Sequence, residues 1–343
     1  MIINNSTKIL VTGGGGFLGS AIISMLLKES SEYEIFSISR NYYNHLESLN
    51  VRQIGGDISN LNFLREIFKK YSFDVVFHTA AYASMWGPWK KFEKNNIVAT
   101  KNIIQVMKEF NIKKLIYTSS PSVVFGSSDL KNVDEETPYP HKHYSYYAKS
   151  KAEAERLVMA ANDGINLLTV SLRPHLIWGP ADQHLIPRVL KLARKRKLKI
   201  VGTGKNLVDI TYIENAAHAH LLAYKSLNPS SPILGCTYFI ADEKPVVLWD
   251  FINKILAINN ISQVKSKVSF KFAYIAGWIA ENIHKYLFNT VLRIDSEPPM
   301  TRFTAMQLAK SHYFNHERAH TDFGYAPIVS LEDGLKQMNI NMN

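Results

Sequence analysis

Residues Thr12-Gly13-Gly14-Gly15-Gly16-Phe17-Leu18-Gly19 form a glycine-rich segment between an apolar run and a helical pattern. Glycine lets the backbone turn sharply and approach a pyrophosphate, whose charge is stabilised at a helix N-terminus. A flexible glycine turn would have the same composition, but dinucleotide binding requires this order of strand, loop and helix. The residues predicted to bind a dinucleotide here are Gly13, Gly16, Phe17, Leu18 and Gly19.

Short apolar runs alternate with helical patterns as far as about residue 174. Strands are expected at 8–12, 34–39, 74–78, 115–119 and 167–173, and helices at 19–28, 60–71, 95–110 and 147–161. Runs such as Val75-Val76-Phe77 are continuously apolar, as expected of parallel strands that are buried on both faces. The pattern predicts an α/β fold, a Rossmann doubly wound parallel sheet with crossover helices.

The rhythm changes after Pro174, where loops lengthen and proline and glycine become more frequent. From Trp249 to Gly324 the pattern is largely helical. We therefore expect a dinucleotide-binding Rossmann domain over 1–174, with a return to the main sheet around 209–225. The rest, 175–343, is expected to form a smaller, mostly helical substrate lobe that is interwoven with the first domain.

The end of the second expected strand should contact the ribose next to the adenine, about 20 residues beyond the glycine loop. The residues there are Ser39 and Arg40 rather than a carboxylate. A guanidinium pairs well with a 2′-phosphate, so we predict a preference for NADP(H), with NAD(H) still open. A surface arginine without a role is the alternative. Further on, Asp57, followed by Ile58, could accept from the adenine amino group or cap the next helix.

Tyr147 and Lys151 are four residues apart, on one face of an expected helix. A tyrosine ionises near pH 10, and a neighbouring ammonium stabilises the phenolate and lowers that pKa. The strand before this helix ends at Ser119-Ser120, where the carboxyl end should face the cofactor crevice. Ser120 could there donate to a substrate carbonyl oxygen. Ser119 and Ser122 are its rivals, and a hydrogen bond to backbone is an alternative role for Ser120.

Several motifs occur together in this order along the chain. They are the glycine loop, Asp57, His78-Thr79-Ala80-Ala81, Asn96, Tyr117-Thr118-Ser119-Ser120, Tyr147 with Lys151, Leu172-Arg173-Pro174, Gly202 to Asp209, Glu297 to Phe303, and Phe323 to Pro327. Together they resemble the extended short-chain dehydrogenases/reductases, and within them the 3β-hydroxysteroid dehydrogenase-like branch. Within that branch, Thr118 to Phe125 is most similar to the 2-alkyl-3-oxoalkanoate reductases. Many NAD-using members of the branch carry an acidic residue where this chain has Ser39, which favours a reductase.

The resemblance implies an enzyme that interconverts a ketone and a secondary alcohol by hydride transfer. It implies that Tyr147 is the acid/base, Ser120 the carbonyl partner, and Lys151 a ribose-binding and proton-relay residue. Asn96 would be a structural and relay residue on the preceding helix. It also implies that the cofactor is bound by Thr79, Ala80, Ala81, Tyr147, Lys151 and Pro174. The alternatives are a nucleotide-sugar epimerase or dehydratase with tightly bound NAD, and a non-catalytic NADP(H)-binding sensor.

Aromatic residues follow several expected strand ends and suit a hydrophobic substrate, either a 2-alkyl-3-oxo acid or a 3β-hydroxysteroid-like molecule. The residues predicted to bind it are Tyr82, Trp86, His175 and Trp178, and a core role is the alternative for each. The segment Lys271 to Leu292 could cover such a substrate, rest on a membrane, or simply pack in the lobe. A homodimer is also compatible with the sequence.

The formal net charge of +11 raises the question of an anionic partner. The densest basic run, Arg194 to Lys199, has no zinc-finger spacing or aromatic RNA-binding signature beside it, so we do not expect a nucleic-acid partner. A solvated helix face, an acidic ligand or an anionic membrane surface could each explain it. One cysteine, Cys236, and no signal-peptide pattern indicate a cytoplasmic protein, with membrane association left open. The histidine pairs lack convergent ligands, so we expect no metal.

Overall fold

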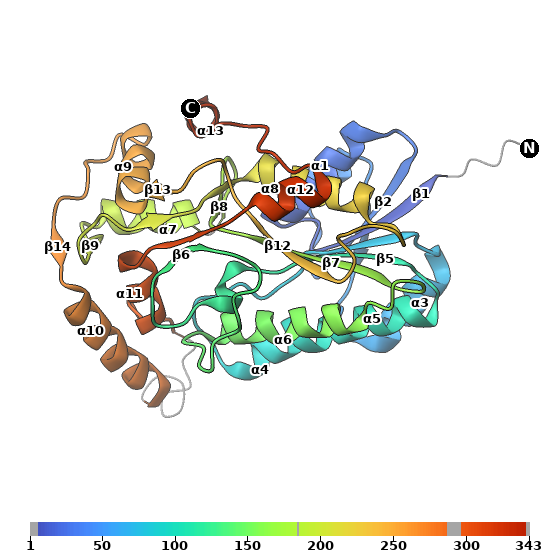
Figure 1. The fold of residues 1–343 in the computed structure, drawn as a ribbon, viewed down its shortest axis with the longest axis horizontal. Helices are drawn as coiled ribbons and strands as arrows, with labels where there is room; N and C mark the ends of the chain where they lie inside the picture. Colours follow the sequence, from blue (N-terminus) through green and yellow to red (C-terminus); the bar gives the residue numbers. More distant parts are fainter. Residues whose placement is uncertain (1–5, 184, 287–295, 341–343) are drawn as a thin grey trace, which may run out of the picture.

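The computed structural model describes residues 6–183, 185–286 and 296–340, which form a parallel sheet flanked by helices with a second lobe at one end (Figure 1). In the described part of the chain the main sheet has seven strands, all paired in parallel, in the order β12-β7-β5-β4-β1-β2-β3. They are β1 (Thr7–Thr12), β2 (Tyr33–Ser39), β3 (Arg52–Gly55), β4 (Val75–His78), β5 (Lys114–Thr118), β7 (Leu168–Pro174) and β12 (Cys236–Ile240). The strand order reverses between β1 and β4, and a crevice opens at such a point beyond the carboxyl ends. The predicted doubly wound Rossmann sheet is confirmed.

Helices cover both faces of this sheet because side chains alternate across each strand. Ile9 and Val11 of β1 point to the face that packs against α1 (Phe17–Glu29) and α8 (Ile213–Ser226). Leu10 points to the opposite face, which is covered by α3 (Leu61–Tyr71), α5 (Ala99–Glu109) and α6 (Tyr146–Ala161). Each fully buried aliphatic side chain stabilises the fold by roughly 1.5–3 kcal/mol. The hydrophobic cores on the two faces of the sheet therefore hold the carboxyl ends of its strands in place.

The lobe is built mainly from the second half of the chain. Its helices are α7 (Leu185–Arg194), α9 (Leu248–Ile258), α10 (Phe270–Ile283), α11 (Arg302–Ala309) and α13 (Leu331–Ile340). Its short strands are β6 (Leu130–Val133), β8 (Ile177–Trp178), β9 (Ile200–Val201), β10 (Leu207–Val208), β11 (Thr211–Tyr212), β13 (Val246–Val247), β14 (Lys267–Val268) and β15 (His312–Phe314). No described helix is long and apolar enough to cross a bilayer.

The domain of the main sheet and the lobe exchange segments. One of these connections differs from the sequence expectation. The strand near residue 209, β11, pairs with β8 of the lobe rather than with the main sheet. The chain instead returns through α8, which packs on α1, and through β12, which pairs with β7. In the other direction, β6 from the first half joins the lobe sheet beside β15. Two-residue strands carry too little periodicity for sequence patterns to assign their partners.

Candidate active site

A cleft of about 460 Å³ lies at the carboxyl edge of the main sheet, beyond the ends of β1, β2, β4 and β5. The residues predicted to bind the cofactor all line it: Gly13, Gly16, Phe17, Leu18, Gly19, Ser39, Arg40, Asp57, Ile58, Thr79, Ala80, Ala81, Tyr147, Lys151 and Pro174. Ser120 lines it as well. Segments far apart in the sequence are therefore brought to one crevice, as the switch-point rule predicts.

The glycine loop forms a cradle that larger residues could not form. Gly13 has φ +71°, and a Cβ on it would lie 3.0 Å from Cα of Ala80 on the loop after β4. A Cβ on Gly19 would overlap the carbonyl oxygen of Gly13. Helix α1 starts directly after Gly16 without a side-chain cap or a first-turn acid, so its first backbone amides remain available to an anion. These residues fit the pyrophosphate of a dinucleotide.

The end of β2 presents a hydroxyl and a guanidinium to the cleft. Ser39 and the exposed Arg40 both line it, and Nη1 of Arg40 donates to Oδ1 of Asn95 at 3.4 Å. A contact of that length at the surface is weak, so the guanidinium is free to turn towards a phosphate. The arrangement fits a ribose that carries a 2′-phosphate.

Asp57 lies at the rim of the same cleft, and the structure decides against its role as a helix cap. Its Oδ1 accepts from the backbone N–H and the hydroxyl of Ser59, and its Oδ2 pairs with Lys94 at 2.9 Å. The cap of α3 is Asn60, which accepts from the backbone N–H of Phe63. Burial raises the pKa of Asp57, but Lys94 and Ser59 outweigh burial and the net pKa is lowered. The residue is therefore a carboxylate acceptor facing the cleft.

Tyr147 and Lys151 project from the first turns of α6 into the cleft, as their spacing predicts. Ser145 caps this helix by accepting from the backbone N–H of Tyr147 at 3.1 Å, so the helix begins just before the tyrosine. Nζ of Lys151 donates to the backbone carbonyl of Thr118 at 2.6 Å and lies 4.3 Å from the ring of Tyr117. The lysine is thereby fixed to the end of β5.

The structure distinguishes Ser120 from the two alternative serines, Ser119 and Ser122. The Ser120 hydroxyl lies near Tyr147 at the cleft, close enough to act on its pKa. Ser119 is 4% exposed, and its buried hydroxyl has no hydrogen-bond partner among the described residues. Ser122 is buried, and its backbone N–H donates to Oγ of Ser120 at 3.2 Å, so the backbone hydrogen bond considered as an alternative role for Ser120 is present. Ser120 is partly exposed while the other two are buried, which favours it over them as the partner of a substrate oxygen.

Burial shifts the pKa values of Lys151 and Tyr147. It lowers the pKa of Lys151 to about 7, with Glu155 opposing the shift. Burial also raises the pKa of Tyr147 above its usual value of 10, and the Ser120 hydrogen bond only partly offsets this rise. The expected lowering of the Tyr147 pKa is thus not found here, because Lys151 is turned to Thr118. A phenol that keeps its proton at neutral pH is suited to donate it.

Asn96 lies behind the cleft rather than in it. It is 2% exposed, on a π-helical turn (Glu93–Val98) at the start of α5. Its Oδ1 accepts from the backbone N–H of Tyr82 at 2.7 Å, and its Nδ2 donates to Oγ of Ser150 at 2.8 Å. Ser150 in turn donates to the carbonyl oxygen of Tyr147. Asn96 therefore fixes helix α6 against the loop after β4.

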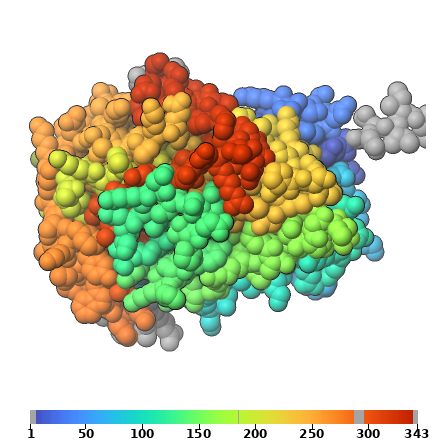
Figure 2. All heavy atoms as spheres, viewed as in Figure 1, coloured from blue at the N-terminus to red at the C-terminus, as the bar shows by residue number. Residues whose placement is uncertain are grey.

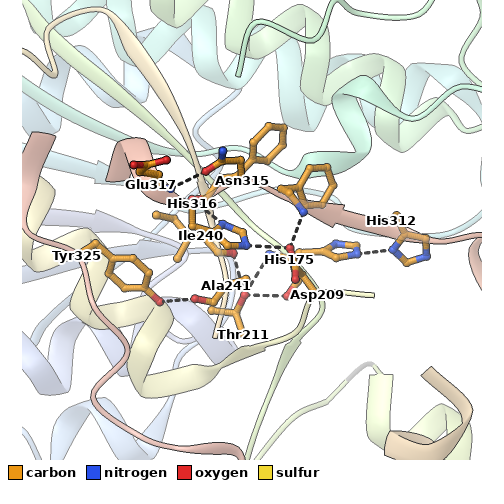
Figure 3. A network of polar contacts seen from close by, with 12 residues as sticks. His175, Asp209, Thr211, Ile240, Ala241, His312, Asn315, His316, Glu317 and Tyr325 are labelled. Atoms are coloured by element: carbon orange, nitrogen blue, oxygen red, sulfur yellow. Dashed lines mark hydrogen bonds and ion pairs between the residues drawn. The ribbon is translucent and has the colours of Figure 1, made fainter. Parts of the chain in front are cut away.

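Two residues predicted to bind substrate are buried elsewhere, which corrects those predictions. Trp178 is fully buried in the lobe core, edge-on to Tyr212 and Phe251, because its large ring fills the centre of that core. His175 is 4% exposed in the network of Figure 3, where its Nε2 donates to Nδ1 of His312 at 2.6 Å. Both follow a strand end, but the chain turns there into the lobe.

The other two, Tyr82 and Trp86, lie on the loop after β4 and are partly exposed. They do not line the cleft itself, although their neighbours Ala81 and Ala83 do. The buried indole nitrogen of Trp86 has no hydrogen-bond partner. Their contact with substrate stays a prediction.

Some residues that line the cleft were missed by sequence reasoning. They include Ile38, Asn41, Tyr43, Gly56, Ala83, Asn95, Leu176, Ile177, Asp182 and Leu185. Gly56 and Ile38 lie at strand ends, so the rule that ligands bind there could have found them. Tyr43 carries no such signal, because its ring reaches the cleft by packing on Gly15, where a Cβ would overlap it.

We expect the stability of the fold to fall in mild acid because four of its histidines are buried. Burial lowers the pKa of His78 to about 3 and of His220 to about 4, and it lowers the pKa values of His175 and His312 as well. As pH falls below about 6.5, the unfolded chain takes up protons that the folded chain refuses, so stability is lost. Each such histidine adds about 1.4 kcal/mol to the loss of unfolding free energy for every unit by which the pH falls.

Asp242, whose pKa burial raises to about 6, partly opposes this loss because the folded chain takes up its proton first. We expect the free energy of unfolding, measured by urea titration, to decrease between pH 6.5 and 5. In His220→Gln the decrease with pH should be less steep, because about one proton fewer is taken up on unfolding. Equal slopes for the variant and the unaltered chain would contradict the neutral, buried state of His220.

Within the described residues no group of three or more histidine, cysteine, aspartate or glutamate side chains is arranged to hold a metal ion. The polar groups at the cleft are instead a glycine loop at a helix N-terminus, a guanidinium, and a serine, tyrosine and lysine at one strand edge. On a doubly wound sheet this set defines the class of extended short-chain dehydrogenases/reductases.

The comparisons place the chain within that class. The model of the 3-beta hydroxysteroid dehydrogenase/isomerase family matches residues 10–271. The chain is 40% identical to the 2-alkyl-3-oxoalkanoate reductase of Stenotrophomonas maltophilia (strain K279a), over 96% of this chain and 98% of that protein. It is 33% identical to the decarboxylating sterol-4-alpha-carboxylate 3-dehydrogenase of Mus musculus, over 98% of this chain and 91% of that protein.

The chain therefore belongs to the 3-beta hydroxysteroid dehydrogenase/isomerase family and is a nicotinamide-dependent oxidoreductase acting on CH–OH or C=O groups. Among solved structures, the UDP-glucuronic acid 4-epimerase from Bacillus cereus in complex with NAD matches with a TM-score of 0.73. That match covers 98% of each chain at 24% identity and shows the fold alone.

Proposed function

We propose that the protein is an NADP(H)-dependent reductase that converts a ketone to a secondary alcohol on a hydrophobic substrate of the 2-alkyl-3-oxo acid class. The observation that carries the proposal is the convergence of Ser120, Tyr147 and Lys151 on the cleft edge at the ends of β5 and α6. The 40% identical relative named as a 2-alkyl-3-oxoalkanoate reductase supports the substrate class. The 33% identical sterol relative keeps a 3β-hydroxysteroid-like substrate as the second candidate.

The residues of the cleft have separate tasks in this reaction. The glycine loop and the first turn of α1 hold the pyrophosphate, Arg40 holds the 2′-phosphate, and Asp57 accepts from the adenine. When bound, the cofactor supplies a hydride to the carbonyl carbon. Lys151, whose ammonium already faces the end of β5, reaches the nicotinamide ribose.

Ser120 and Tyr147 act on the substrate oxygen. Their hydroxyls lie together, so both can donate hydrogen bonds to one carbonyl oxygen and stabilise the negative charge that develops on it. Tyr147 then gives its proton to that oxygen. Burial raises the Tyr147 pKa, so the phenol carries its proton at neutral pH and is in the form that can donate it.

The cofactor preference is tested at Arg40. Arg40→Ala removes the guanidinium, and we expect the KM for NADPH to rise at least roughly tenfold while the KM for NADH changes little. The matched control is Arg52→Ala, because Arg52 lies at the opposite, amino end of β3 and pairs with Glu34. An enzyme that prefers NADH before any substitution would contradict the NADP(H) preference.

The substrate class is tested by initial rates on a panel of 2-alkyl-3-oxo acids of increasing chain length, compared with steroid 3-ketones. We expect kcat/KM to rise with alkyl length, because each buried methylene contributes about 0.8 kcal/mol. Tyr82→Ala and Trp86→Ala should reduce this gain for long chains if the two rings contact the substrate. Turnover confined to steroids would replace the first substrate class by the second.

A further inference from the structure

Helix α10 lies at the outer end of the lobe (Figure 1). One of its faces is apolar and exposed to solvent. Its large side chains, with that of Tyr286 just beyond it, are between 46% and 66% exposed. They are Phe272, Ile275, Trp278, Ile279, Ile283 and Tyr286. Single exposed apolar residues are common on proteins, but a contiguous stripe on one helix marks an interaction surface. In the space-filling view the orange segment that includes this helix forms the outer edge of the molecule (Figure 2).

The opposite face of α10 fixes the helix firmly to the lobe. Ala273, Gly277 and Glu281, four residues apart, are its buried positions. A Cβ on Gly277 would lie 2.7 Å from the backbone of Thr301, so the helix packs closely on the start of α11. Glu281 accepts from Nε of Arg302 at 2.8 Å. The exposed stripe is therefore held in place as a rigid surface.

Cations surround this apolar face. Lys271 and Lys285 are exposed at its two ends, and Lys265 and Lys267 are exposed on the segment that leads into it. From 265 to 286 the sole acidic residue is Glu281, which is buried in its pair with Arg302. Pairing of β14 with β9 also places Lys267 opposite Ile200, which directly follows the basic run Arg194 to Lys199. An apolar stripe within a cationic rim is complementary to an anionic lipid surface.

We propose that this face of α10 docks the enzyme on the surface of a membrane containing anionic phospholipid. The helix has 14 residues and is about 21 Å long, shorter than the roughly 30 Å apolar layer of a bilayer, so it lies along the interface. A second copy of the chain fits less well, because a symmetric pairing of two such faces would bring the cationic rims together.

The docking face has a physical link to the catalytic helix. The side chain of Tyr274 on α10 lies close to those of Tyr144 and Arg302 and interacts electrostatically with them. Tyr144 lies three residues before Tyr147, on the loop that enters α6. The α10 face is therefore near the loop that leads into α6. A hydrophobic substrate dissolved in the bilayer would be close to that loop.

The test is co-sedimentation of the whole protein with vesicles of phosphatidylcholine alone and of phosphatidylcholine with about a quarter phosphatidylglycerol. The variant is Ile275→Asp with Ile279→Asp, two exposed positions on the α10 face. The matched control is Ile165→Asp with Ile328→Asp, two isoleucines that are exposed outside the lobe helices. Both double variants change the net charge equally, so a difference between them reports the apolar face. Thermal unfolding midpoints close to that of the unaltered chain confirm that both variants fold.

We expect the unaltered protein and the control pair to sediment with the anionic vesicles and the α10 pair to stay in solution. Lys267→Gln with Lys271→Gln should weaken binding to anionic vesicles by roughly tenfold or more while leaving the protein folded. Sedimentation that is absent for the unaltered chain, or unchanged in the α10 pair, would overturn the proposal. A dimer that the α10 pair dissociates in solution, with no vesicle binding, would assign the face to a second copy instead.

Discussion

Tyr147→Phe is expected to lower kcat by roughly a thousandfold while the cofactor dissociation constant changes by less than about twofold. The substitution removes one oxygen atom, which lies near Ser120 and is the group that we propose as the proton donor. The ring itself remains, so the lining of the cleft keeps its shape. Rates of NADPH consumption and a fluorescence titration of NADPH binding give the two quantities separately.

The matched control is the neighbouring Tyr146→Phe. Tyr146 is 48% exposed and packs edge-on against Trp89, away from the cleft lining. Its variant should keep kcat within about twofold of the unaltered enzyme, as is usual for an exposed position. Comparable activity in Tyr147→Phe would refute the proton-donor role, and equal losses in both variants would point to a folding effect.

The second large effect is expected at the buried ion pair between Arg173 and Glu155, behind Lys151. Arg173 donates to both carboxylate oxygens of Glu155, with Nη2 at 2.7 Å from Oε1, and the two side chains are 3% and 0% exposed. Burial raises the Glu155 pKa, but Arg173 outweighs it and keeps the carboxylate charged. Arg173→Met leaves that charge without its partner, so we expect the free energy of unfolding to fall by roughly 3–5 kcal/mol.

The control for this prediction is Arg188→Met, which breaks the surface pair between Arg188 and Glu297. These side chains are 38% and 43% exposed, so solvent screens the pair and its loss should cost less than about 1 kcal/mol. Urea denaturation of both variants gives the comparison. A loss below about 1 kcal/mol for Arg173→Met would mean that Glu155 takes up a proton or water reaches it.

The sequence allowed the sheet, the cofactor cleft and the catalytic helix to be predicted because each rests on a local signal. The glycine loop encodes the turn, and the four-residue spacing of Tyr147 and Lys151 places both on one face of α6. Favouring Ser120 over Ser119 and Ser122 needed the structure, because the three neighbouring serines differ in burial and not in any sequence pattern.

The lobe was less predictable because its contacts join residues far apart in the chain. His175 and Trp178 follow a strand of the main sheet, yet their partners His312, Tyr212 and Asp242 come from later segments. A pattern along the chain cannot show that these segments meet and bury the two rings. The exposed face of α10 has the same origin: its sequence is apolar enough for a core helix, and only the packing of α11 on one side shows which residues stay outside.

Net reduction of a ketone with NADPH is tested by following the cofactor and the product together. Purified protein is mixed with NADPH and a 2-alkyl-3-oxo acid, and NADPH consumption is compared with the amount of 3-hydroxy product. We expect steady NADPH consumption matched by equal product formation, with much slower consumption of NADH. No net consumption, together with tightly held NAD released when the protein is denatured, would refute the proposed reductase and favour a nucleotide-sugar epimerase.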